Sequence, residues 1–398
     1  MNSTPRIFRL PYQDCRRIFD TLQTLSSLSG EPLVRNMNTT LPTPAACFEE
    51  TLDRELGRES SSVQSKPLTF LPRHGETKHH HALTGTPDTK VTRKVPRILV
   101  TGKDGQLGFE LSRSLQTVGQ VIAVGRDALD MTDGQKIRNL IAQECPDFIV
   151  NAAAYTAVDK AESDRETCRL VNAVAPQMMA EAALACGATL LHYSTDYVFD
   201  GRSLAPYKET DACAPQSVYG ATKYAGEEGI AASGAAHFIF RTSWVVGAYG
   251  SNFAKTVLRL AREREEIRIV ADQKGAPTPA WLLADLAAFM IRSAQFDRDF
   301  VDRHAGVYHV SPQGETTWHG YAQHVVRRLT ALGVKLRADE LRVVPISTSE
   351  YPVLAKRPAN SMLDTTKLRA IPGIVLPDWQ STLEPVLRLI AQDARLVS

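Results

Sequence analysis

The sequence predicts an α/β fold with a doubly wound parallel sheet, from three observations. From residue 97 onward, short β-branched runs alternate with stretches of helical periodicity. Several of these runs are apolar on both alternating faces, as strands covered by helices on each side must be. The first run leads directly into a glycine-rich turn followed by an amphipathic segment. A sheet with helices on both faces accounts for all three.

The expected elements follow this alternation in chain order. The predicted strands of the first part are 97–101, 120–124, 147–151, 189–194, 237–242 and 267–270. Helical periodicity predicts helices over 106–116, 135–143 and 177–186. Beyond residue 245 the pattern is less regular, with helices predicted over 252–264, 281–293 and 318–331 and short strands over 306–310 and 341–345. We interpret residues 95–245 as one domain and residues 246–398 as mainly a smaller, mixed α/β substrate-binding region.

Residues 1–94 differ from the rest of the chain. They are rich in Ser, Thr, Pro and charged residues and have only short apolar clusters, so a disordered extension is predicted. The run His79–His81 is interpreted as part of a solvated polar tail rather than as a metal site. A natural start near Val95 is the alternative, which a native peptide from residues 1–90 would exclude. The arginine-rich amino terminus also leaves an organelle transit peptide open as a minor alternative.

Composition excludes several classes of function. The formal net charge is only +2, so no broad basic surface for nucleic acid or anionic lipid is expected. No stretch approaches the roughly 18 apolar residues that a membrane span needs. Six scattered cysteines show no metal-ligand spacing and fit a reduced, cytoplasmic protein. We therefore expect a protein with no membrane, nucleic-acid or metal partner.

The first predicted strand runs into GKDGQLG, which places Gly102, Gly105 and Gly108 at a turn and at the start of a helix. Glycines at these positions allow positive backbone angles and let a pyrophosphate approach the main-chain N–H groups. An ordinary tight turn is the alternative, but the strand–turn–helix context is the one that dinucleotide binding requires. The pattern indicates a Rossmann-like NAD(P)-binding domain over residues 95–245.

The end of the second strand reads VGRD, where such folds distinguish the two nicotinamide cofactors. An acidic residue there binds the ribose 2′-hydroxyl of NAD, whereas an arginine suits the 2′-phosphate of NADP. Arg126 therefore favours NADPH. A role as a solvated turn residue accounts for Arg126 equally well, so NADH stays open as the alternative cofactor.

The segment SVYGATKYAGE contains Tyr219 and Lys223, four residues apart and on one face of the expected helix. We expect the Lys223 ammonium to lower the pKa of the Tyr219 phenol from its usual value of about 10. Tyr219 would then donate a proton to a carbonyl oxygen as hydride reaches its carbon. Thr195, just past an apolar strand, is expected to donate a hydrogen bond to the same oxygen.

Six strings, in this order and at these separations, resemble the dTDP-4-dehydrorhamnose reductase family of extended short-chain dehydrogenases/reductases. They are GKDGQLG, VNAAAYTAVDKAE, HYSTDYVFDG, SVYGATKYAGE, FRTSWV and KRPANSMLDTTKL. The resemblance covers about residues 97–390. It implies reduction of a 4-keto group to give dTDP-L-rhamnose for cell-surface polysaccharide such as O-antigen.

The resemblance also implies roles for individual residues. Tyr219 would be the proton donor, Lys223 its partner and ribose ligand, and Thr195 the hydroxyl that polarises the carbonyl. Cofactor contacts are implied for Gly105, Gln106, Leu107, Asp130, Met131, Ala154, Tyr155, Thr156 and Tyr193. Nucleotide-sugar contacts are implied for Asp196, Val198, Phe199, Trp244 and Arg357. For Tyr193 and Phe199 core packing is the alternative, and for Arg357 a surface salt bridge.

Departures from the family pattern and competing functions qualify this interpretation. Some members dimerise around magnesium through a glutamate where this chain has Trp281, which argues against magnesium and favours a monomer or a homodimer with another interface. A nucleotide-sugar epimerase or dehydratase would share Thr195, Tyr219 and Lys223. Dehydratases usually add an acid pair after the threonine, and here Asp196 is followed by Tyr197. A non-catalytic subunit resembling that of methionine adenosyltransferase is the remaining alternative.

Overall fold

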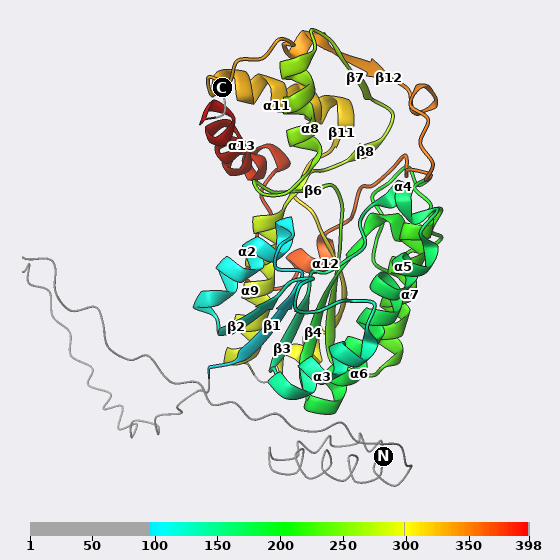
Figure 1. Cartoon of the computed structure of the whole chain (residues 1–398), viewed down its shortest axis with the longest axis vertical. Coiled ribbons are helices and arrows are strands. Elements are labelled where there is room, and N and C mark those ends of the chain that lie inside the picture. The colour runs from blue at the N-terminus through cyan, green and yellow to red at the C-terminus, as the bar shows by residue number, and fades with distance from the viewer. Residues whose placement is uncertain (1–94, 298, 397–398) are drawn as a thin grey trace, which may run out of the picture. The chain divides into compact units, whose positions relative to one another are not determined.

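The computed structural model describes residues 95–297 and 299–396 (Figure 1). The chain divides into one unit of residues 1–93 and a second unit of residues 94–398. The predicted extension and its histidine run lie outside the described residues.

A six-stranded sheet forms the centre of this unit, and all of its strand pairs are parallel. Its order is β2 (Gln120–Val124), β1 (Arg97–Thr101), β3 (Phe148–Asn151), β4 (Thr189–Thr195), β5 (His237–Thr242) and β10 (Gly306–Val310). The chain runs from β1 to one side and returns to the other side at β3. Open α/β sheets bind ligands at the carboxyl ends of the strands that flank such a reversal.

Helices cover both faces of the sheet, as the predicted fold class requires (Figure 1). One face packs on α2 (Gln106–Ser114) and α9 (Ala280–Phe296). The other packs on α3 (Gly134–Glu144) and α6 (Ala175–Cys186), with α7 (Val218–Ala232) against α6. The alternation of strand side chains divides the core: Ile98 and Val100 belong to the first face, and Leu99 to the second. The prediction of a doubly wound α/β fold is confirmed.

Two strands join different sheets from those the sequence indicated. Residues 306–310 were expected in the substrate-binding region, but β10 pairs with β5 as the sixth strand of the main sheet. Conversely, β7 (Ile267–Val270) was expected with the first group, yet it pairs in parallel with β12 (Val343–Ile346) in a separate two-stranded sheet. Local pattern shows that a segment is extended and buried, whereas its pairing partner depends on contacts far along the chain.

The smaller region has its own apolar core. It is built by α8 (Phe253–Glu263), α11 (Trp318–Ala331) and α13 (Trp379–Leu396), which pack around the buried Tyr321 together with β7 and β12. The remaining short α-helices and strands, counting those beside the main sheet as well, are α4 (Val158–Ala161), α5 (Arg165–Arg169), β6 (Val245–Val246), β8 (Lys274–Gly275), β9 (Thr278–Pro279), α10 (Phe300–His304), β11 (Thr316–Thr317) and α12 (Thr366–Arg369). The predicted mixed α/β character of this region is confirmed.

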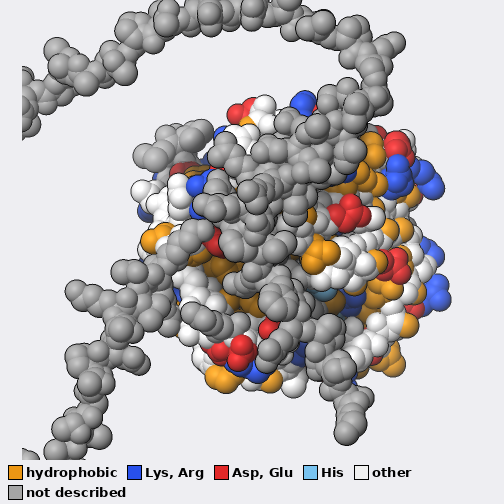
Figure 2. All heavy atoms as spheres, turned by 90° about the horizontal axis from the view of Figure 1, so that it is seen from below, with side chains coloured by type: hydrophobic (Ala, Val, Ile, Leu, Met, Phe, Trp, Pro, Cys, Tyr) orange, Lys and Arg blue, Asp and Glu red, His pale blue; other side chains and the backbone are white. Residues whose placement is uncertain are grey.

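Charged groups of both signs are interspersed over the part of the described surface visible in Figure 2. This distribution agrees with the near-neutral composition of the chain. Among the described residues, no helix combines the length and the apolar character that crossing a membrane demands.

Candidate active site

The glycine turn lies between β1 and α2, as predicted. Gly102 has a φ of +75°, and the Gly105 N–H donates to the Gly102 carbonyl at 3.0 Å. A Cβ on Gly108 would lie 1.9 Å from the Gly102 carbonyl oxygen, so no side chain fits there. Gly108 therefore allows the first turn of α2 to approach the glycine turn closely. Such an arrangement leaves main-chain N–H groups exposed to a diphosphate.

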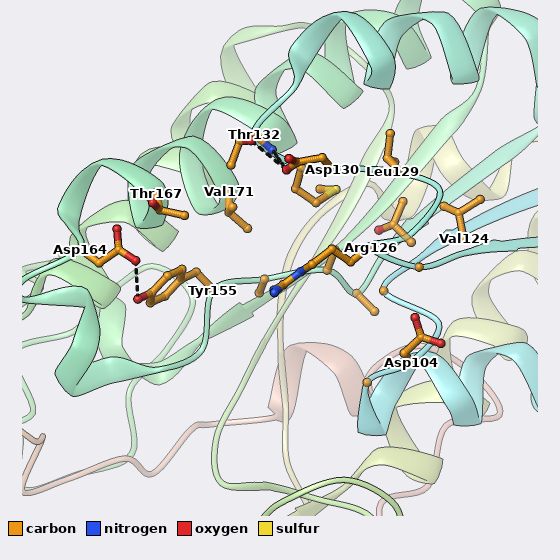
Figure 3. Close-up of a pocket in the computed structure, with 18 of the residues that line it drawn as sticks. Asp104, Val124, Arg126, Leu129, Asp130, Thr132, Tyr155, Asp164, Thr167 and Val171 are labelled. Carbon is orange, nitrogen blue, oxygen red and sulfur yellow. Dashed lines mark hydrogen bonds between the residues drawn. The ribbon is translucent and has the colours of Figure 1, made fainter.

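A cavity of about 610 Å³ lies beside this turn, at the carboxyl ends of β1, β2 and β3 (Figure 3). Seven of its lining residues were predicted cofactor contacts: Gly102, Gly105, Arg126, Asp130, Met131, Ala154 and Tyr155. The cavity is where the sheet reversal predicts a ligand, and its volume suits a large part of a dinucleotide.

Arg126 and Asp130 have different surroundings in this cavity. Figure 3 shows the Arg126 side chain extending across it from the end of β2 towards Tyr155. The Asp130 carboxylate instead accepts hydrogen bonds from the backbone N–H and the hydroxyl of Thr132, at 2.9 and 2.8 Å. These bonds lower the pKa of Asp130. Asp130 thus stabilises the turn, while Arg126 offers a positive charge to a ligand.

One wall of the cavity was missed from the sequence. It contains Lys160, Asp164, Thr167 and Val171, from α4 to the π-helical turn of residues 170–174. Asp164 accepts a hydrogen bond from the Tyr155 hydroxyl at 3.0 Å and so orients that ring. The polar run DKAESDRET, directly after the third strand, is the signal that could have located this wall.

Several predicted cofactor residues do not line this cavity. Gln106 accepts hydrogen bonds from the Gly247 N–H at 2.8 Å and from Asn252 at 2.9 Å, so its side chain joins α2 to the start of α8. The Tyr193 ring lies in the core, and its hydroxyl donates to the Leu283 carbonyl at 3.2 Å. The others also lie elsewhere: Leu107 packs against the core, Gly108 is buried and Thr156 is exposed.

Thr195 and Tyr219 are brought together although they lie on different elements. Thr195 ends β4, and Tyr219 lies in the first turn of α7, where the Ser217 hydroxyl caps the helix by accepting from the Gly220 N–H. The Thr195 hydroxyl lies close enough to the Tyr219 phenol to lower its pKa. Two hydroxyl groups this close together can both donate hydrogen bonds to the oxygen of one ketone.

Lys223 does not act on Tyr219 as the sequence suggested. Its Nζ lies 2.5 Å from the Tyr193 carbonyl oxygen and 2.9 Å from Nε2 of His192, and the side chain is buried. Burial lowers the pKa of Lys223 to about 8. Burial also raises the pKa of Tyr219, and the neighbouring Thr195 hydroxyl opposes this effect only in part. The expected lowering of the Tyr219 pKa by Lys223 is therefore wrong, because the Lys223 amine binds partners on β4 and burial raises the pKa of Tyr219.

The predicted sugar-contacting residues after β4 are buried. Asp196 accepts a hydrogen bond from the Thr195 hydroxyl at 3.1 Å, and burial raises its pKa to about 6. Val198 and Phe199 form a small apolar cluster in which Phe199 stacks on Tyr207, with ring centroids 4.3 Å apart. Packing thus explains Val198 and Phe199 in this structure.

Arg357 reaches the site from the carboxy-terminal part of the chain. It donates to the Tyr197 hydroxyl at 3.2 Å and to the Asp159 carboxylate at 2.5 Å. Tyr197 in turn contacts Tyr219 edge to face, with centroids 5.4 Å apart. Arg357 therefore forms the ion pair given as its alternative role, and it does so next to the proposed proton donor.

Trp281 has a structural partner, since its Nε1 donates to the Thr382 carbonyl at 3.1 Å. Within residues 95–297 and 299–396, no group of three or more His, Cys, Asp or Glu side chains is arranged to hold a metal ion.

Comparison with known proteins decides the family. A family model described as the RmlD substrate binding domain matches residues 96–391. The dTDP-4-dehydrorhamnose reductase of Burkholderia thailandensis is 47% identical over 284 residues, which cover 71% of this chain and 95% of that protein. The chain belongs to the dTDP-4-dehydrorhamnose reductase family.

Other members of the reductase family agree with this result. The Escherichia coli K12 dTDP-4-dehydrorhamnose reductase is 47% identical over 294 residues, covering 73% of this chain and 96% of its own length. A solved structure of the Bacillus anthracis reductase in complex with NADP is 34% identical with a TM-score of 0.67, covering 74% of this chain and 99% of that one. The family match begins at residue 96, so residues 1–95 lie outside it.

Proposed function

We propose that this chain reduces the 4-keto group of dTDP-4-dehydro-β-L-rhamnose with NADPH to give dTDP-L-rhamnose. The observation that carries this proposal is the pairing of the Thr195 and Tyr219 hydroxyls at the carboxyl end of the sheet. Membership of the reductase family supplies the substrate class. The nucleotide sugar is thus its proposed small-molecule partner.

The raised pKa of Tyr219 makes it a weaker acid than an ordinary tyrosine, so its proton transfer depends on the negative charge that develops on the ketone oxygen. A phenol with a raised pKa is fully protonated at neutral pH, so it can donate to the ketone oxygen as negative charge develops there. Thr195 donates its one hydroxyl proton to the same oxygen in place of the Asp196 carboxylate, and so holds that oxygen in place. NADPH, when bound, supplies the hydride to the adjacent carbon. Lys223 would hold the cofactor ribose through an N–H that its two partners on β4 leave available.

The residues around the cavity fit a phosphorylated nicotinamide cofactor. Gly102, Gly105 and Gly108 permit a diphosphate to approach the main chain, and Arg126 places a guanidinium where a 2′-phosphate would be neutralised. The related B. anthracis reductase was solved in complex with NADP, which supports the same choice here. NADPH is therefore the proposed cofactor, with NADH as a slower alternative.

We further propose that Asp196 and Trp244 contact the nucleotide sugar and that Arg357 exchanges Asp159 for the sugar diphosphate. The reaction would take place in the cytoplasm, for cell-surface polysaccharide such as O-antigen. The protein would act as a monomer or homodimer without magnesium. Residues 95–245 would mainly bind the cofactor, and residues 246–398 mainly the sugar nucleotide.

The experiment is to mix the purified chain with NADPH and dTDP-4-dehydro-L-rhamnose and to follow the nicotinamide absorbance. Tyr219→Phe should lower kcat by about 10²–10⁴-fold, as expected for loss of a general acid, at nearly unchanged NADPH affinity. Tyr351→Phe, which removes a hydroxyl from an exposed ring, is the matched control and should keep full activity. Full activity of Tyr219→Phe would exclude it as the proton donor, and no turnover by the unmodified chain would refute the substrate assignment.

A further inference from the structure

A buried row of polar side chains crosses the sheet and ends at Lys223. The Thr101 hydroxyl on β1 donates to Oδ1 of Asn151 on β3 at 2.7 Å. Nδ2 of Asn151 lies 3.0 Å from Nδ1 of His192 on β4, and Nε2 of His192 lies 2.9 Å from Nζ of Lys223 on α7. None of these four side chains is more than 2% exposed. Each therefore has to find its hydrogen-bond partners within the protein.

The orientation of the Asn151 amide is determined by a backbone group. The Ala153 N–H donates to Oδ1 of Asn151 at 3.2 Å, and a backbone N–H can only donate. Exchanging the oxygen and nitrogen of the amide would bring its NH₂ group against this N–H. The amide NH₂ must therefore point towards His192.

This orientation selects one tautomer of His192. The Asn151 NH₂ group only donates, so Nδ1 of His192 must be the unprotonated acceptor. Burial lowers the pKa of His192 well below its usual value, so the ring is neutral and carries its single proton on Nε2. That N–H points at Nζ of Lys223, where it requires an acceptor.

An ammonium has no lone pair, whereas a neutral amine has one. A neutral Lys223 would accept from His192, donate one N–H to the Tyr193 carbonyl 2.5 Å away and keep a second N–H for another partner. A protonated Lys223 would instead direct an N–H at the N–H of His192. The network thus favours the neutral amine.

We propose that His192 is a positioning residue that Asn151 holds in the Nε2–H tautomer, so that it donates a hydrogen bond to Lys223 and favours the neutral amine in the cofactor-free protein. Its consequence for catalysis rests on the proposed reductase function, because only there does the charge of Lys223 affect a bound cofactor. The tautomer itself follows from the hydrogen-bond network alone.

The other groups that face Lys223 do not oppose this arrangement strongly. Cys168, from α5, is buried, and burial raises the pKa of its thiol, so it stays uncharged at neutral pH. The Glu227 carboxylate on α7 favours the ammonium, but it is held by Arg241 on β5 at 2.6 Å and by further hydrogen bonds. Burial already lowers the pKa of Lys223 to about 8, and the conflict of two donors would lower it further.

The first test is the ¹⁵N NMR spectrum of histidine-labelled, cofactor-free full chain, with His192 assigned by its loss in His192→Gln. We expect the chemical shifts of an unprotonated Nδ1 and a protonated Nε2 at neutral pH. A protonated Nδ1, or a doubly protonated ring, would overturn the proposal. This measurement needs no turnover, so it stays informative if the proposed reaction is not found.

The second test is Asn151→Asp. A carboxylate can only accept a hydrogen bond, so it would favour the His192 tautomer that carries its proton on Nδ1. Nε2 of His192 would then accept from a Lys223 ammonium. We expect the ¹⁵N pattern of His192 to invert. We also expect the proton affinity of Lys223 to rise at least tenfold, as read from its titration midpoint by ¹³Cε NMR with the signal assigned by Lys223→Arg. An unchanged tautomer in a folded Asn151→Asp protein would contradict the proposal.

Two controls separate the tautomer from the added negative charge. Asn172→Asp places a carboxylate at another buried asparagine that hydrogen-bonds Tyr155, Cys168 and Thr222 but not His192, and it should leave the tautomer unchanged. In a His192→Phe background, Asn151→Asp should shift the Lys223 midpoint much less. An equal shift with and without His192 would show that charge acts directly through space, which would overturn the positioning role.

Discussion

The indole rings of Trp244 and Trp318 stack with centroids 3.7 Å apart and planes inclined by 17°. Trp244 follows β5 and has a φ of +48°, a region that non-glycine residues rarely adopt. Nε1 of Trp318 donates to Oε1 of Gln273 at 3.1 Å, which fixes the second ring. The positive φ and the stacked ring of Trp318 hold Trp244 in one orientation against the apolar core, and its contact with the nucleotide sugar stays a prediction.

Gly275→Ala should displace this tryptophan pair. A Cβ at position 275 would lie 2.5 Å from the Trp244 ring, so the ring or the β8 backbone must move. We expect a loss of about 1–3 kcal/mol in the free energy of unfolding and a raised KM for the nucleotide sugar, with the Kd for NADPH unchanged. Trp318→Phe, which keeps a ring against Trp244, should have a smaller effect. A normal sugar KM in Gly275→Ala would argue against a role for Trp244 in substrate binding.

Gly108→Ala should disrupt the cofactor turn, while Gly105→Ala serves as its matched control. The new methyl group at 108 would lie 1.9 Å from the Gly102 carbonyl oxygen, whereas at 105 the same atom would be 3.4 Å away with an ordinary φ of −81°. We expect Gly108→Ala to lower Tm and to abolish NADPH binding measured by calorimetry. Gly105→Ala should keep a nearly normal Tm. Equal Tm values for both variants would show that the close approach of α2 is not required.

Arg126→Ser should reduce the preference for NADPH over NADH. The guanidinium extends into the cavity and would form charge-assisted hydrogen bonds with a 2′-phosphate (Figure 3). We expect kcat/KM for NADPH to fall about tenfold or more, the equivalent of about 1.4 kcal/mol, while kcat/KM for NADH changes little. A similar loss with both cofactors would mean that Arg126 does not recognise the 2′-phosphate.

Asp196→Asn should change how stability depends on pH. Burial raises the pKa of Asp196 in the folded protein to about 6, above its usual value of 3.8. Between pH 3.8 and pH 6 the folded state holds a proton on Asp196 that the unfolded state releases. The contribution of Asp196 to the free energy of unfolding is therefore fully present below pH 3.8 and is lost as pH rises through 6. Relative to the unmodified chain, Asp196→Asn should gain roughly 2 kcal/mol of unfolding free energy between pH 4.5 and 7.5. Urea unfolding at both pH values measures this gain, and an equal difference at both would contradict the raised pKa.

The linear pattern of residues was sufficient to predict the strands of the main sheet and the glycine turn. The bounds of β1, β2 and β5 agree with the predicted ones, because alternation of apolar residues and the positions of glycine are local properties. Seven predicted cofactor residues line the cavity: Gly102, Gly105 and Arg126 were predicted from the local pattern, and Asp130, Met131, Ala154 and Tyr155 from the family resemblance. The roles of these residues in binding stay predictions.

Contacts between segments far apart in the sequence determined the features that the sequence did not predict. Only the folded sheet places β10 beside β5, joins Gln106 to α8 and buries the Lys223 amine between His192 and the Tyr193 carbonyl. The pKa of Tyr219 changes in the direction opposite to the one expected because burial and hydrogen-bond partners, which sequence spacing does not encode, determine it. Sequence periodicity indicates which side of a helix or strand is buried. Which other element packs against that side depends on the tertiary fold of the whole chain.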